Sequence, residues 1–134
     1  MTDTDRQLRV AAGIFLAGFV LHNVDHGRRG IDVITDHVVW AGTVVAIVAA
    51  VVLTLIFTRH PFAPTAAAAA GFGIAFGVTA SHLLPEWSAF SDPLASGDTD
   101  PLTWVAVLSE IGGAAVMGAA GWRAMRVQHP VATT

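Results

Sequence analysis

The chain of 134 residues contains no cysteine and no lysine, and it has few charged residues of any kind. Without cysteine it can form neither a disulfide nor a thiolate metal site, so a bound metal would need nitrogen and oxygen ligands. All seven basic residues are arginine and the formal net charge is −3, which argues against nucleic acid as a partner. These absences exclude disulfide-stabilised, thiol-dependent and nucleic-acid-binding proteins.

Charged residues make up 13% of the chain, whereas about a quarter is usual for a soluble domain, and 54% of the residues are hydrophobic. We therefore expect an integral membrane protein embedded in a lipid bilayer. A membrane-spanning helix needs about 20 mostly apolar residues, and four windows of this kind are present, at 7–26, 36–57, 65–84 and 102–122. The predicted fold is all-α, a single four-helix transmembrane domain over residues 1–134 with short loops and both termini on the same side.

The arginines predict the orientation of this bundle. One side receives both termini and five arginines, and the other side receives two, Arg28 and Arg29. By the positive-inside rule both termini are expected in the cytoplasm, with the protein in the plasma membrane. The N-terminal apolar stretch is expected to be retained and not cleaved as a signal peptide, because polar residues, and no small-x-small cleavage site, follow it.

The first predicted helix carries polar residues that its length does not explain. Only 12 residues, roughly 18 Å of helix, separate Arg9 from His22, which is too short to cross a hydrocarbon layer of about 30 Å. His22, Asp25 and His26 are therefore expected within the outer part of the membrane, where spacings of three and four place them on one helical face. The alternative is that they cap the helix and reach the interface.

Two further helices bring histidines to a similar depth. His37 follows Asp36 at the start of the second window, and His82 lies near the end of the third, three residues before Pro85. An interfacial position is the alternative interpretation for each of them. Histidines at one level on three helices nevertheless favour a shared site.

Glu110 is the most informative residue of the sequence. It lies eight residues after Leu102 and twelve before Trp122, so its side chain has no short route to water. The helical face that carries Glu110 is made mainly of small residues, which favours a position of this face inside the bundle. That face consists of Thr103, Ala106, Val107, Gly113, Ala114, Met117 and Gly121. The alternative is a neutral carboxyl that only links helices by a hydrogen bond.

Imidazoles and carboxylates in this combination suit a transition metal, Zn(II) or Fe(II). The predicted ligands are His22, His26, His37, His82 and Glu110. With an open coordination position, metal-assisted hydrolysis is conceivable, and Glu110 and Asp25 are then the candidate catalytic bases. The sequence leaves open whether the chain is an enzyme.

Three other functions remain open. Haem b could be held by His22 and His82 on facing helices. Histidines and acids could instead make a pH-responsive protein, or the chain could be an accessory subunit. Glycine-rich helix faces, at Gly13, Gly18, Gly73, Gly77, Gly112 and Gly118, could pack helices within the chain, in a homo-oligomer or in a larger membrane complex.

Overall fold

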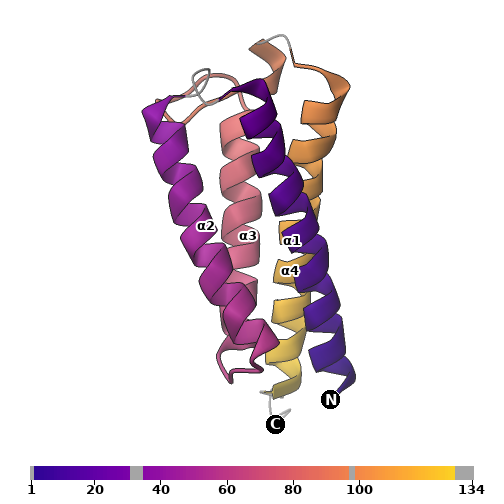
Figure 1. The fold of residues 1–134 in the computed structure, drawn as a ribbon. Coiled ribbons are helices and arrows are strands. Elements are labelled where there is room, and N and C mark those ends of the chain that lie inside the picture. Colours follow the sequence, from indigo (N-terminus) through magenta and orange to yellow (C-terminus); the bar gives the residue numbers. More distant parts are fainter. Residues whose placement is uncertain (1, 31–34, 97–98, 129–134) are drawn as a thin grey trace.

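The computed structural model describes residues 2–30, 35–96 and 99–128, and within these ranges it contains helices and no strand. Helix α1 spans Asp3–Arg29, α2 spans Asp36–Phe57, α3 spans Ala63–His82 and α4 spans Pro101–Gln128, with one 3-10 turn, η2, at Leu94–Ser96. The helices alternate in direction, so the start of α1 and the end of α4 lie at the same end of the bundle (Figure 1). The predicted all-α class with four helices able to cross a membrane is confirmed.

Local capping explains where α1 begins and ends. The Thr2 hydroxyl accepts a hydrogen bond from the Asp5 N–H at 3.1 Å, and the Asp5 carboxylate accepts one from the Thr2 N–H at 3.1 Å. This capping box begins the helix four residues before the predicted window at 7–26. Gly30 ends it with a φ of 97°, a conformation that costs glycine little, while its N–H bonds the His26 carbonyl.

Proline residues determine where α3 ends and where α4 begins. Helix α3 stops at His82, two residues short of the predicted window at 65–84, because Pro85 disfavours helical geometry in the residue before it. Pro101 is the first residue of α4, and the Asp100 carboxylate caps this helix by accepting a hydrogen bond from the Thr103 N–H at 3.0 Å. That N–H also lowers the pKa of Asp100 below its ordinary value of 3.8.

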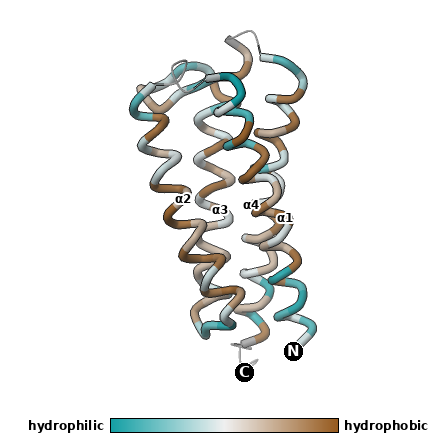
Figure 2. The backbone as a smooth tube through the Cα atoms, in the orientation of Figure 1, coloured by the Kyte–Doolittle hydropathy of each residue, from teal (hydrophilic) through white to brown (hydrophobic). Residues whose placement is uncertain are grey.

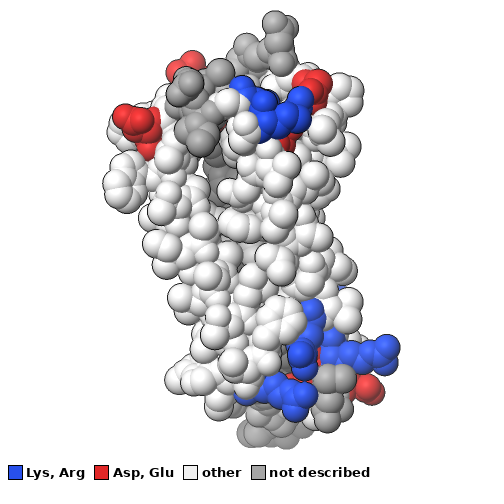
Figure 3. All heavy atoms as spheres, viewed as in Figure 1, with Lys and Arg blue, Asp and Glu red and all other residues white. Residues whose placement is uncertain are grey.

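The surface has polar residues at its two ends and an apolar band between them, as a membrane-spanning protein requires. Hydrophilic residues gather at the two ends of the helices, and the middle turns are mostly pale or brown in Figure 2. In the view of Figure 3 arginines and acids likewise occupy only the two ends, and a wide uncharged band separates them. Large apolar side chains such as Phe76 and Ile47 are exposed in this band, as expected for contact with lipid.

Glycines allow α4 to lie directly against α1 and α3. A Cβ atom at Gly18 of α1 would lie 2.4 Å from the Ser109 carbonyl oxygen, and one at Gly71 of α3 would lie 2.4 Å from the Gly118 nitrogen. No side chain fits at either place. By contrast, a Cβ at any of four other glycines on the predicted packing faces would meet nothing within 4 Å, so these glycines are not used for close packing within the chain. They are Gly13, Gly73, Gly77 and Gly112.

Helix α2 is the least embedded of the four helices. It buries only Val38 near its start and Ala49, Val52 and Ile56 in its second half. It packs mainly against α3 and lies at the edge of the bundle (Figure 1). The closely packed core of the bundle is therefore formed by α1, α4 and α3, and α2 covers one side of it.

Candidate metal centre

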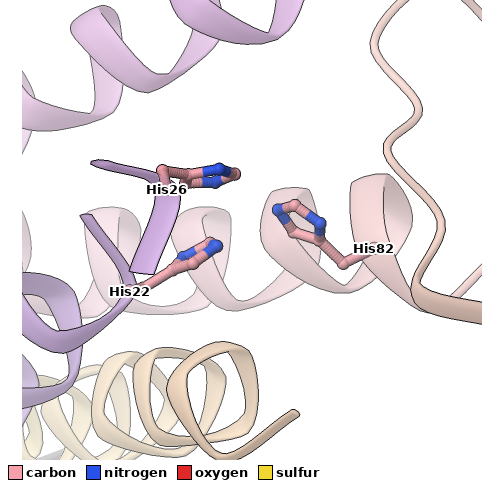
Figure 4. A group of neighbouring side chains, drawn as sticks. All are labelled: His22, His26 and His82. Atoms are coloured by element: carbon pink, nitrogen blue, oxygen red, sulfur yellow. The ribbon is translucent and has the colours of Figure 1, made fainter. Parts of the chain in front are cut away.

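Three histidines from two helices converge near the end of the bundle that carries the loop between α3 and α4. His22 and His26 lie one turn apart on α1, and His82 is the last residue of α3. Each offers one ring nitrogen within 4.8 Å of those of the other two. Their ring centroids lie 4.6 Å apart for His22 and His26 and 4.9 Å apart for His22 and His82, and Figure 4 shows the three rings turned toward one another.

Glu110 reaches this group through His22. The Nδ1 atom of His22 and a carboxylate oxygen of Glu110 form a buried hydrogen bond, and both side chains are almost inaccessible, at 7% and 3% exposed. With Glu110 ionised, the Nδ1–H of His22 donates and the other ring nitrogen, Nε2, is left to bind a ligand. Carboxylates commonly orient metal-binding histidines in this way.

The loop after α3 orients His82. Its Nδ1 donates to the Asp92 carbonyl oxygen at 2.9 Å, which leaves Nε2 free. The loop is held in place because the Asp92 N–H donates to the Ser81 carbonyl and the Ser81 hydroxyl donates to the Phe90 carbonyl. Sequence reasoning missed Asp92, since a backbone carbonyl ten residues away leaves no pattern that periodicity can detect.

Two ring nitrogens in the group have no hydrogen-bond partner. The Nε2 of His22 and the Nδ1 of His26 are buried and unpaired. A buried polar atom without a partner costs about 1–3 kcal/mol. A cation bound between the two adjacent rings would supply the missing partner of both nitrogens.

Asp25 is turned away from the three histidines. Its carboxylate pairs with the Arg28 guanidinium at 2.7 Å, and the same guanidinium reaches Asp100 at 2.8 Å and the Thr103 hydroxyl at 3.3 Å. Arg28 thus joins the end of α1 to the start of α4, and Asp25 pairs with it, although the i, i+3 spacing from His22 favoured one shared site. A residue three positions along a helix is rotated by about 60°, enough to face a different neighbour.

His37 also lies outside the group. It is exposed at the start of α2, and its ring packs edge-on against Phe90 with centroids 5.6 Å apart. The reason is the position of α2, which lies at the edge of the bundle and brings no ligand to the inner layer. The structure therefore brings together four of the five predicted ligands, three as a ring-nitrogen set and Glu110 as the partner of His22.

The geometry favours a single ion over haem. Axial histidines must approach iron from opposite faces of a porphyrin. The rings of His22 and His82 are instead 4.9 Å apart and inclined at 75°, with His26 beside both. No flat macrocycle fits between rings so close together.

No protein-family model matches the chain, and no curated protein or solved structure is detectably similar to it.

Proposed function

We propose that the chain is a membrane-embedded metalloprotein that binds one transition-metal ion, with Zn(II) favoured over Fe(II), through His22, His26 and His82. The observation that carries this proposal is the pair of buried, unpaired ring nitrogens within a set of three converging imidazoles. Three neutral imidazoles suit Zn(II), and the Glu110 carboxylate behind His22 supplies compensating negative charge.

Metal-assisted hydrolysis is the activity that this ligand set supports best. Catalytic zinc sites typically keep three protein ligands and leave the fourth position for water or substrate. Glu110 is the only acid among the described residues that line the cavity beside the histidines, and its hydrogen bond to His22 Nδ1 makes it the group that would orient this ligand and compensate its charge during such a reaction. Asp25 has no such position, because it pairs with Arg28.

Elemental analysis tests the metal directly. Protein purified in detergent without a histidine tag or chelator is expected to contain about one zinc per chain, as a single three-histidine site requires. His22→Ala, His26→Ala and His82→Ala should each remove most of it, whereas His37→Ala and His60→Ala should leave it unchanged. Replacement by Co(II) should give visible absorption bands of a low-coordinate site. A metal content far below one per chain would reject the proposal and favour a pH-responsive or accessory role.

A further inference from the structure

A cavity of about 600 Å³ lies beside the histidine group, between α2 and the α1–α3 side of the bundle. This volume is typical of pockets that enclose small organic ligands, about 300–1,000 Å³. The histidines and Glu110 contribute to its wall, but most of the lining is apolar. Representative lining residues are Phe19, Val38, Val39, Ala46, Phe76 and Val78.

The other polar side chains of the lining already donate hydrogen bonds to backbone carbonyls. The Asn23 amide donates to the Phe19 carbonyl at 2.8 Å, the Thr43 hydroxyl to the Val39 carbonyl at 2.9 Å, and the Ser81 hydroxyl to the Phe90 carbonyl at 2.6 Å. Among the described lining residues, the buried side-chain atoms that lack a partner are the ring nitrogens of His22 and His26. The cavity therefore offers hydrocarbon contacts along most of its wall and polar contacts at the histidines.

The cavity lies next to the part of α2 in which no side chain is buried. No residue of α2 between Val38 and Ala49 is buried, and this stretch supplies the α2 wall of the cavity. Because α2 faces lipid at the edge of the bundle, a molecule dissolved in the bilayer could enter here without crossing water.

From these features we infer that the cavity receives the hydrocarbon chain of a membrane amphiphile whose carbonyl group lies at the three histidines, and that a fatty acyl ester is the substrate class. The position of the carbonyl rests on the proposed metal-binding function. Hydrolysis would add water to the ester carbonyl and break its C–O bond, which yields a fatty acid anion, an alcohol and one proton.

Two glycines of the lining allow the cavity to be filled without disturbing the metal ligands. A Cβ at Gly42 of α2 or Gly77 of α3 would meet nothing within 4 Å, so leucine at either position has room to project. Gly73, one turn before Gly77, is equally open but does not line the cavity. Gly42→Leu and Gly77→Leu are therefore the test variants, and Gly73→Leu is the matched control.

The first measurement is the binding of 11-(dansylamino)undecanoic acid, a fluorescent fatty acid, to the detergent-purified full chain. The unmodified protein and Gly73→Leu should enhance the fluorescence with similar affinity, whereas Gly42→Leu and Gly77→Leu should weaken binding at least tenfold. All four proteins should contain the same amount of metal. Equal binding by all four proteins, or no binding by the unmodified protein, would overturn the assignment of the cavity.

The second measurement is hydrolysis of p-nitrophenyl esters by the zinc-loaded protein. The octanoate should be cleaved with a kcat/KM at least tenfold above that of the acetate, and this preference should disappear in Gly77→Leu. Equal rates for the two esters, or no hydrolysis of either, would overturn the substrate class. If the purified protein contains no metal but still binds the fluorescent fatty acid, the proposed metal function is rejected and the assignment of the cavity stands. The two outcomes can be separated because fluorescence and elemental analysis are independent measurements.

Discussion

The Nδ1 of His22 and the carboxylate of Glu110 are hydrogen-bonded across the α1–α4 contact although 88 positions separate the two residues. The bond places a carboxylate behind one metal-binding imidazole, in a region from which water is nearly excluded. It connects the two polar residues that the sequence places deepest in the bundle, and the first prediction concerns it.

Glu110→Gln should weaken metal binding without unfolding the protein. Glutamine keeps the shape and can still hydrogen-bond, but it removes the negative charge that orients and compensates His22. Loss of such an outer-shell partner typically costs about 10–100-fold in metal affinity. Competition with a chromogenic zinc chelator would measure the change, with Glu86→Gln, at an exposed position of the loop, as the control. Unchanged affinity would mean that Glu110 only links helices.

Gly71→Ala should destabilise the bundle, and Gly73→Ala should not. The added methyl group at Gly71 would lie 2.4 Å from the Gly118 nitrogen, so α3 and α4 would have to separate. Overpacking of this kind costs about 1–3 kcal/mol. At Gly73 the methyl group meets nothing within 4 Å. Thermal unfolding in detergent should give a lower midpoint for Gly71→Ala only, and equal midpoints for the two variants would contradict the tight α3–α4 contact.

Arg28→Met should lower the melting temperature more than substitution of an exposed arginine such as Arg126. Its guanidinium pairs with the buried carboxylate of Asp25, which would otherwise keep an uncompensated charge. Adding Asp25→Asn to Arg28→Met removes that charge and should restore part of the lost stability. The pair is structural if metal content stays constant in all these variants. Metal loss in Asp25→Asn alone would instead return Asp25 to the metal site.

The orientation of the bundle remains a prediction from the arginine distribution. Because the chain has no cysteine, single cysteines can be labelled without background. An impermeant thiol reagent applied to intact cells should label Ala95→Cys, in the loop between α3 and α4, and should not label Thr58→Cys, at the opposite end of the bundle. Both residues are exposed. The reverse pattern would place the histidine group on the cytoplasmic side.

The sequence alone determined the helical class and the buried face of α4. Every residue assigned to the face of Glu110, from Thr103 to Gly121, is buried in the structure. This succeeded because helical periodicity and the length needed to cross a bilayer are local properties, readable from about 20 consecutive residues. The shared level of His22 and His82 followed from the same counting along their helices.

Only the tertiary structure decided which polar residues meet. The rotation of α1 brings His22 to both His82 of α3 and Glu110 of α4 but turns Asp25 to Arg28, and the edge position of α2 leaves His37 outside the group. Whether a glycine packs tightly, as Gly71 does, or stays open, as Gly77 does, likewise depends on the neighbouring helix. Sequence spacing fixes positions along and around one helix, whereas contacts depend on how neighbouring helices are rotated and offset, which is set by side-chain packing over the whole bundle.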